Sequence, residues 1–249
     1  MEAALRRTLV ITDNRMVHDA LERMVATLGL SEQLCIRRSP HGSSELPQLP
    51  AIDVKADAAA IVEQFELVIS AHCKQIFPVT LHGQRECINI HPGHNPQTRG
   101  CFPQVWSILH QLPLGFTVHR IDAQLDHGHI IHRQQLPLYA WDTSWTAYQR
   151  VVAAEMDWLH HNLLHLLRGD YAATPMTESG HLFLRRDFNA LLEIDLQQTG
   201  TWQAFIDHLR AVTFPRYRNA WFRDPESGRK IHISIQLDAD PDTPSTSKP

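Results

Sequence analysis

The chain has 249 residues, which is enough for one catalytic domain with a smaller appendage, since domains usually hold about 100 to 200 residues. Its 23 Lys and Arg residues against 27 Asp and Glu give a net charge of −4, so no overall positive field exists to gather nucleic acid or an anionic membrane surface. No segment approaches the roughly 18 apolar residues of a membrane span, and the apolar stretch after Arg7 is too short for a signal peptide. We therefore expect a cytoplasmic protein without a nucleic-acid or membrane partner.

The first half of the chain alternates apolar strands with amphipathic helices. Residues 8–12 are β-branched and apolar, and apolar side chains then recur at helical spacing over 16–28. Further elements of the same kind are a strand at 34–37, a helix at about 54–65, and strands at 67–70 and 88–90. Strands that are apolar on both faces and alternate with helices predict an α/β fold, a mostly parallel twisted sheet with helices on both faces. Ligands bind beyond the carboxyl ends of such strands, which favours Asp13, the loop 71–78 and the residues after Asn89.

The second half of the chain ends in short elements punctuated by proline. The predicted elements are a helix over 102–112, strands at 116–121 and 128–132, a long helix over 143–167, a further helix over 202–212, and a hairpin whose second strand is 231–237. We divide the chain into a catalytic domain (1–180), a C-terminal extension with a helix and a β-hairpin (181–238), and a disordered tail rich in Pro, Ser, Thr and Asp (239–249).

Three residues in the middle of the chain form a pattern suited to acyl transfer. Asn89 and His91 lie two apart on an extended segment, so both side chains leave the same face. Asp126 follows in a Gly-terminated turn between two predicted strands. Transfer of an acyl group to an amine needs a proton acceptor, a donor for the oxyanion and a carboxylate beside the imidazole, and it needs no Ser or Cys nucleophile. These residue types at this spacing make Asn89, His91 and Asp126 candidates for a catalytic site, although each of them taken alone is more often a turn former or a surface residue.

Two other classes of function remain open on the residues alone. A metal-dependent hydrolase would use the neighbouring His127, His129 and His132. On a strand the first two share a face but the third points away, and no carboxylate lies at a convincing ligand spacing, so we predict no metal site. A non-catalytic nucleotide-sugar binding module would keep the region around Arg99 and Phe102 without a reactive centre.

Several motifs together resemble a known family. They are Asn-Ile-His-Pro-Gly at 89–93, Asn-Pro-x-x-Arg-Gly at 95–100, Phe-Pro-Gln at 102–104 and Leu-Asp-His-Gly at 125–128. This set is similar to the N10-formyltetrahydrofolate-dependent formyltransferases, specifically the sugar N-formyltransferases that act on dTDP-linked amino sugars. The resemblance implies the formyltransferase fold and N10-formyltetrahydrofolate as cosubstrate. It implies a dTDP-amino-dideoxyhexose as acceptor, with dTDP-4-amino-4,6-dideoxyglucose expected, for O-antigen or other surface polysaccharide synthesis.

The same resemblance implies that Asn89, His91 and Asp126 are catalytic, and it implies a role for each. Asn89 would donate to the formyl oxygen, and Asp126 would orient His91 and assist proton transfer to the leaving folate nitrogen. His91 would either accept the proton of the sugar amine or steady the oxyanion, and the sequence leaves both open. It also leaves open whether the amine is on C3 or C4 of the sugar.

Binding residues and assembly follow from the resemblance as well. The implied folate-binding residues are His72, Lys74, Gln75, Phe77, Leu125, His127 and Gly128. The implied nucleotide-sugar residues are Asn95, Arg99, Phe102, Gln104, Arg216, Tyr217 and Trp221, of which the arginines suit a diphosphate and the aromatic rings suit stacking on thymine. The resemblance implies a homodimer built partly from the C-terminal hairpin. The strand 231–237 has an apolar row that an isolated hairpin cannot bury, so this row must pack on the main domain or on a partner.

Overall fold

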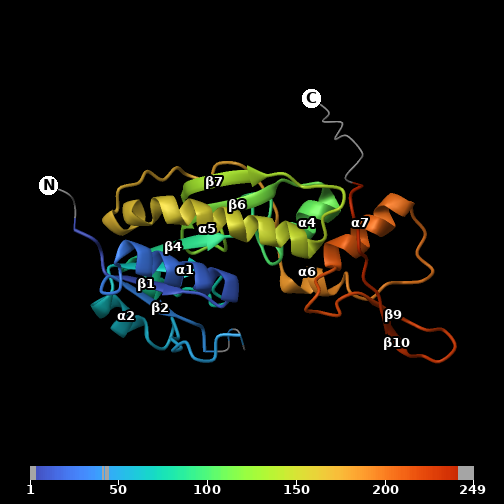
Figure 1. The fold of residues 1–249 in the computed structure, drawn as a ribbon, viewed down its shortest axis with the longest axis horizontal. Helices are drawn as coiled ribbons and strands as arrows, with labels where there is room; N and C mark the ends of the chain where they lie inside the picture. Colours follow the sequence, from blue (N-terminus) through green and yellow to red (C-terminus); the bar gives the residue numbers. More distant parts are fainter. Residues whose placement is uncertain (1–3, 41, 43–44, 241–249) are drawn as a thin grey trace.

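The computed structural model describes residues 4–40, 42 and 45–240, and its centre is a six-stranded sheet (Figure 1). The strands of this sheet are β1 (Thr8–Ile11), β2 (Leu34–Arg37), β3 (Leu67–Ala71), β4 (Glu86–His91), β6 (Leu114–Arg120) and β7 (Ile130–Leu136). Their order is β2-β1-β3-β4-β6-β7; the first four run parallel, and β6 and β7 are antiparallel to their neighbours. The predicted mostly parallel sheet is confirmed.

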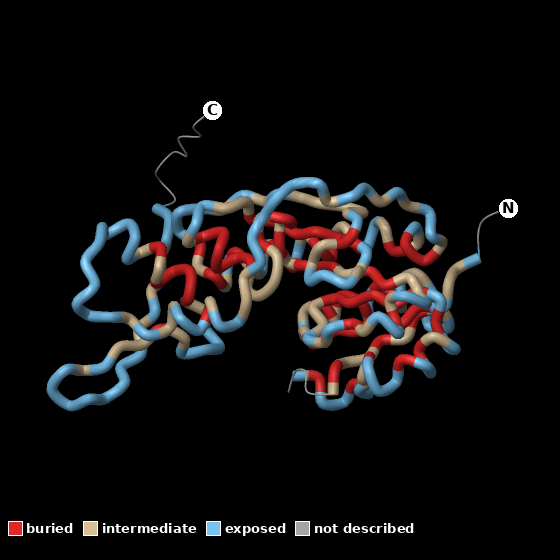
Figure 2. Tube along the Cα trace, turned by 180° about the vertical axis from the view of Figure 1, so that it is seen from behind, coloured by how far each residue is buried: buried red, intermediate tan, exposed pale blue. Residues whose placement is uncertain are grey.

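Helices cover both faces of the sheet because alternate strand residues point to opposite sides. Val10 packs in a core with α1 (Arg15–Leu28) and α5 (Ser144–Arg168). Leu9 and Ile11 pack on the other face, with α2 (Ala58–Gln64) and α3 (Val79–His82). All of these β1 side chains are fully buried. Figure 2 shows buried segments in the interior of the molecule and exposed segments around them. Burial on both faces explains why the strands read as continuous apolar runs.

Local polar groups set the ends of the helices that border the sheet edge. The Asn14 side chain accepts from the backbone N–H of Met16 and Val17 and caps α1. The helix expected from residue 54 begins only at Ala58, because the Asp53 carboxylate accepts from the N–H of Lys55 and holds a turn there. None of the helices in the described residues is long and apolar enough to cross a membrane.

The C-terminal extension packs on α4 through a separate apolar core. Its elements are β8 (Leu182–Phe183), α6 (Arg185–Asn189), α7 (Trp202–Val212), β9 (Trp221–Arg223) and β10 (Lys230–His232). Strand β8 pairs with β5 (Arg99–Gly100), and α7 packs on α4 (Pro103–His110). The predicted C-terminal helix and hairpin are present. Figure 2 shows the hairpin as an exposed loop at the end of the molecule.

The strand predicted over 231–237 is shorter in the structure, and this part of the prediction is wrong. The β-ladder ends at His232; beyond it the Ile233 N–H donates to the Ala220 carbonyl, and the Ile235 N–H donates to Thr213 Oγ1. Both isoleucines are partly buried against the core shared by α4 and α7, so this chain covers part of the expected apolar row itself, while Ile231 is 42% exposed. The domain boundary at residue 180 stays a prediction, and residues 241–249 of the expected tail lie outside the described residues.

Candidate active site

A cavity of about 790 Å³ lies at the carboxyl ends of β1, β3 and β4. It is walled by the loops that follow these strands, the loop before β7, the N-terminal turns of α5, and two segments of the C-terminal extension. Asn89, His91 and Asp126 all line it. This is the sheet edge where a mostly parallel fold brings its loops together.

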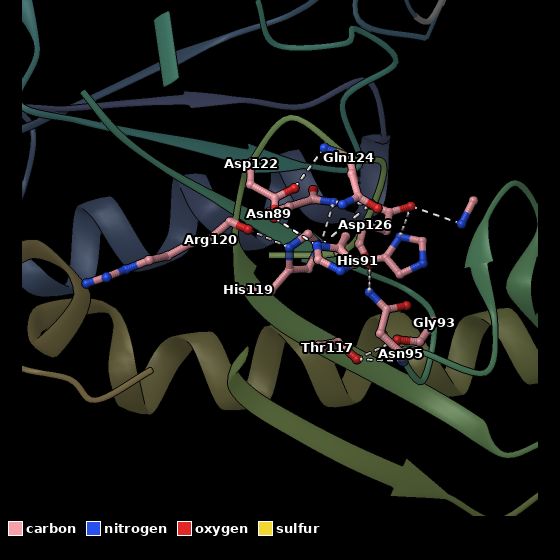
Figure 3. Close-up of polar contacts among 12 residues, drawn as sticks. Asn89, His91, Gly93, Asn95, Thr117, His119, Arg120, Asp122, Gln124 and Asp126 are labelled. Atoms are coloured by element: carbon pink, nitrogen blue, oxygen red, sulfur yellow. Dashed lines mark hydrogen bonds and ion pairs between the residues drawn. The ribbon is translucent and has the colours of Figure 1, made fainter. Parts of the chain in front are cut away.

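Asn89 lies at the centre of a polar cluster (Figure 3). Its Nδ2 donates to Asp126 Oδ1 at 2.9 Å and lies 3.3 Å from His119 Nε2. His119 Nδ1 donates to the Arg120 carbonyl at 2.8 Å, so the neutral ring has its lone pair at Nε2 and accepts from Asn89. Both hydrogens of the Asn89 amide are therefore engaged, and donation to a formyl oxygen requires one of these bonds to open.

His91 is held so that one ring nitrogen is basic. Its Nε2 lies 3.3 Å from the Thr98 carbonyl oxygen, which can only accept, so the proton of the neutral ring is on Nε2. The other nitrogen, Nδ1, lies 3.6 Å from Asp126 Oδ2. Burial lowers the pKa of His91 below its usual value, although the Asp126 charge opposes this shift. The ring is thus neutral at neutral pH, with a carboxylate placed to stabilise its protonated form.

Asp126 joins the loop before β7 to the rest of the site. Burial tends to raise its pKa, but the imidazoles of His91 and His119 and the Gly100 N–H outweigh burial and hold the pKa well below its usual range. The Gly100 N–H donates to Oδ2 at 3.0 Å, and the Asn95 side chain donates to the Asp126 carbonyl at 3.0 Å. Asp126 has a left-handed backbone, with φ of 48°. The site therefore holds a carboxylate at neutral pH.

Gly93 is required by the close packing around His91. A Cβ atom at this position would lie 2.5 Å from His91 Nε2 and 2.6 Å from the Thr98 carbonyl oxygen. No side chain fits there without displacing the imidazole. The glycine of the Asn-x-His-Pro-Gly motif thus has a steric reason in this fold.

The structure places most of the predicted binding residues in the wall of the cavity. These are His72, Lys74, Gln75, Phe77, Leu125, Phe102, Gln104, Arg216 and Tyr217. Two of them already use their side-chain amides within the fold: Gln75 bonds to Ile52 and Val54, and Gln104 donates to Ser144. Their contribution to ligand binding stays a prediction.

Five predicted residues do not line the cavity: Asn95, Arg99, Trp221, His127 and Gly128. Asn95 is fully buried and Arg99 lies in the short β5 strand. The ring of Trp221 is covered by Arg223 and Lys230, and His127 pairs with Asp122 at 2.9 Å. Gly128 lies against the Arg120 carbonyl, which leaves no room for a side chain. Their assignment to ligand binding stays a prediction that the cavity lining does not support.

Other cavity residues escaped the sequence prediction. His119 faces Asn89 because the two are directly opposed in the antiparallel β4–β6 ladder. An aromatic wall forms where Phe214 meets Trp145, with ring centroids 4.7 Å apart, and Tyr217, at 5.5 Å. The Arg216 guanidinium lies over Trp145 and pairs with Glu45. Only a register between distant strands, or a contact between helix and extension, would have revealed His119, Trp145 and Phe214; Arg216 and Tyr217 were predicted from the sequence.

The histidines of the metal alternative are separated in the fold. His127 pairs with Asp122, and the His132 ring stacks on Trp158 with centroids 4.9 Å apart. Over residues 4–40, 42 and 45–240, no three or more His, Cys, Asp or Glu side chains are grouped to hold a metal ion.

Fold and site together define an N-formyltransferase, and comparison with known proteins gives the family. Residues 45–163 match the model described as formyl transferase, and residues 187–239 match the N-formyltransferase dimerization C-terminal domain. The dTDP-4-amino-4,6-dideoxyglucose formyltransferase of Mycobacterium tuberculosis is 40% identical over 92% of this chain and 96% of that relative. The chain belongs to the formyltransferase family.

Solved structures agree with this assignment. A sugar N-formyltransferase from a Shewanella species superposes with a TM-score of 0.89 and 37% identity, over 94% of this chain and 98% of that one. A 4-N formyltransferase from Francisella tularensis has a TM-score of 0.87 and 30% identity, over 94% and 99% of the two chains. The family resemblance and the formyltransferase fold predicted from the motifs are confirmed.

Proposed function

We propose that this enzyme transfers a formyl group from N10-formyltetrahydrofolate to the amine of dTDP-4-amino-4,6-dideoxyglucose. The observation that carries the proposal is the buried group of Asn89, His91 and Asp126 in the cavity wall. The acceptor is taken from the relative that is 40% identical over nearly its whole length. The cavity volume of about 790 Å³ lies within the range of small-molecule sites.

The proposed reaction moves one proton. The amine nitrogen bonds to the formyl carbon, the bond from that carbon to N10 of the folate breaks, and the proton lost by the amine ends on N10. We assign proton acceptance to His91 Nδ1, because Nε2 already donates to Thr98. Asp126, 3.6 Å away, stabilises the imidazolium that forms. Asn89 is assigned to the formyl oxygen, which would take over the amide hydrogen now directed at His119.

The two substrates are assigned to different walls of the cavity. Residues 72–77, with Lys74 and Phe77, are assigned to the folate, as the family resemblance implies. The aromatic wall of Trp145, Phe214 and Tyr217 suits stacking on thymine. The Arg216 guanidinium, which lies over Trp145, suits the diphosphate.

A formylation assay tests this proposal. Purified protein is incubated with N10-formyltetrahydrofolate and a panel of dTDP-3-amino and dTDP-4-amino sugars, and the products are analysed by mass spectrometry. We expect a product heavier by one CO with dTDP-4-amino-4,6-dideoxyglucose. Formylation of a 3-amino sugar in preference would correct the acceptor, and no product with any sugar would refute the function.

We also propose a cellular setting and an assembly that extend beyond this reaction. The enzyme acts in the cytoplasm and supplies a formylated sugar to O-antigen or another surface polysaccharide. It forms a homodimer through the extension, whose residues 187–239 match a dimerization domain. Exposed apolar side chains in this region support the proposal, above all Trp202, which is 82% exposed, and Phe205 beside it.

Sedimentation separates the contributions of the two apolar regions of the extension. Trp202→Asp should convert a dimer to monomers with little loss of stability, because this side chain lies on the surface. Ile233→Asp should instead lower the melting temperature, since Ile233 packs in the core of its own chain. A wild-type protein that sediments as a monomer at micromolar concentration would rule out the dimer.

A further inference from the structure

A second imidazole–carboxylate pair lies beside the cavity, on the face of the sheet that α5 covers. Glu155, in α5, is 0% exposed. Its Oε2 accepts from His72 Nε2 at 2.7 Å, and His72 lines the cavity whereas Glu155 does not. A buried carboxylate is costly unless it is paired, so a mid-helix glutamate at this position needs a reason.

The pair ends a directional chain of hydrogen bonds. The Asn14 side-chain oxygen caps α1, so its Nδ2 is the group that donates to the Tyr148 oxygen, at 2.5 Å. Burial raises the pKa of Tyr148, so its hydroxyl keeps its proton. His72 Nε2 donates to Glu155 at 2.7 Å, and its Nδ1 forms a hydrogen bond with this hydroxyl at 2.8 Å. Both nitrogens of His72 are therefore occupied and neither is free to bind a ligand.

His72 also has an unusual backbone. Its φ is 62°, in the left-handed region that residues with a side chain rarely adopt. This residue turns the chain from the end of β3 into the 72–77 wall, which carries Lys74 and Phe77 into the cavity. The wall is fastened on its other side, where the Lys74 N–H donates to Asp13 Oδ2 at 2.8 Å. The hydrogen bond to Glu155 and the left-handed turn thus belong to the same residue, His72.

We propose that Glu155 is a positioning residue for formyl transfer: by holding the His72 side chain, it keeps the left-handed turn and the 72–77 wall in the conformation that binds the formyl donor. The inference rests on the proposed function, because it assigns this wall to the folate. Glu155 acts through His72 and contacts no substrate. The hydrogen-bond chain joins three cavity walls, namely the β1–α1 loop, the β3–α3 loop and α5.

Steady-state kinetics of Glu155 variants test the role of the anchor. Glu155→Gln keeps an oxygen that accepts from His72 and should change KM for the formyl donor by less than about threefold. Glu155→Leu removes the acceptor and should raise that KM by about tenfold or more, with a smaller change in kcat. Asp157→Leu, on an exposed position of the same helix, is the matched control and should leave both constants unchanged. A wild-type KM in Glu155→Leu, or equal impairment in the Gln and Leu variants, would overturn the inference.

His72 variants test the same inference independently of how Glu155→Leu folds. Glycine adopts a positive φ readily but alanine does not, so His72→Ala should raise KM for the formyl donor more than His72→Gly. In the His72→Gly background Glu155→Leu should add no further increase, because the two residues act as one unit. Equal increases of KM in His72→Ala and His72→Gly would refute the positioning role. So would a KM increase in the double variant equal to the product of the two single increases. Formylation by the wild-type protein in the same assay shows that the proposed function holds, so failure of the positioning role can be told apart from failure of the function.

Discussion

Two histidines of one cavity, His91 and His72, both lie against buried or nearly buried carboxylates, yet their ring nitrogens are used differently. His72 has short hydrogen bonds on both sides, 2.8 Å to Tyr148 and 2.7 Å to Glu155. His91 has longer contacts, 3.3 Å to the Thr98 carbonyl and 3.6 Å between Nδ1 and Asp126. An imidazole bonded at both nitrogens is fixed in place, whereas one with a nitrogen unbonded beside a carboxylate can take up a proton. On this difference we base the proposal of a positioning role for His72 and a chemical role for His91.

The two carboxylates differ in the same way. Asp126 lies in a loop with a left-handed backbone, lines the cavity, and has partners from three segments of the chain. Glu155 lies in the middle of a long helix behind the cavity wall. A carboxylate in the wall can respond to charge that forms on a substrate, while one behind the wall acts only through its partner. Substitutions in the two pairs should therefore give different kinetic results.

The largest expected effect is on kcat and comes from removing His91, the proposed base. His91→Ala should lower kcat by about 10² to 10⁴-fold, the usual contribution of a positioned acid or base. Binding of the nucleotide sugar, measured by calorimetry, should remain, because His91 is assigned to the reacting amine and to no part of the nucleotide. His72→Ala should lower kcat far less. Turnover near the wild-type value in His91→Ala would contradict the assignment of the base.

A smaller loss of kcat is expected when the His91 side chain is displaced but still present. Gly93→Ala brings a methyl group against His91 Nε2, and a shift of about 1 Å in a catalytic group can cost about 10²-fold in rate. Gly200→Ala is the control, because a Cβ at this position meets nothing within 4 Å. Both variants are compared by kcat and by thermal melting. Unchanged kcat in Gly93→Ala would mean that the position of His91 is less critical than the geometry implies.

The two imidazole–carboxylate pairs also show which parts of the site could be predicted from the sequence alone. The Asn89, His91 and Asp126 pattern could be predicted because strand periodicity and a Gly-terminated turn are local signals and because the motifs around them resemble a known family. The sheet and most helices followed from the same local rules. His119 could not be found in this way, because its partner Asn89 is set by the register of the β4–β6 ladder. Glu155 meets His72 only through packing of α5 on the sheet.

Residues that the resemblance assigned to binding were harder to place. Asn95 and Trp221 lie in matching motifs, yet one is fully buried below the Asp126 loop and the other lies under cations of the hairpin. A motif preserves the neighbourhood of a site but does not say which side chains face the ligand. The strand predicted to 237 failed for a related reason, since period-two alternation continues where Ile233 and Ile235 leave the ladder and pack on α4 and α7.

A moderate effect is expected in the pH dependence of catalysis. His91 must be neutral to accept a proton, and burial lowers its pKa from the usual 6.5. A base with a lowered pKa stays unprotonated to a lower pH, so kcat/KM should be constant through neutrality and fall only below pH 6.5. Asp126 remains ionised throughout this range. A pH–rate profile checks this, and an acid limb centred above pH 6.5 would contradict a buried neutral base.

The smallest expected effect is on the pH dependence of stability. It tests the lowered pKa of His91 by a measurement that needs no substrate. Because its folded-state pKa is lowered, the unfolded chain binds a proton more readily than the folded chain as the pH falls below 6.5. The stability linked to this group is present above pH 6.5 and is lost as the pH falls toward the folded-state pKa. His94 and His132 shift in the same direction and add to the wild-type slope, so the comparison must be with a variant. His91→Gln does not titrate, and its melting temperature should therefore fall less between about pH 7.5 and pH 5.5 than that of the wild type, by about 2 to 4 °C for each kcal/mol of linked stability. If the melting temperatures of the two proteins fell equally with pH, His91 would be free to take up a proton in the folded state. The assignment of His91 as a buried neutral base would then be lost.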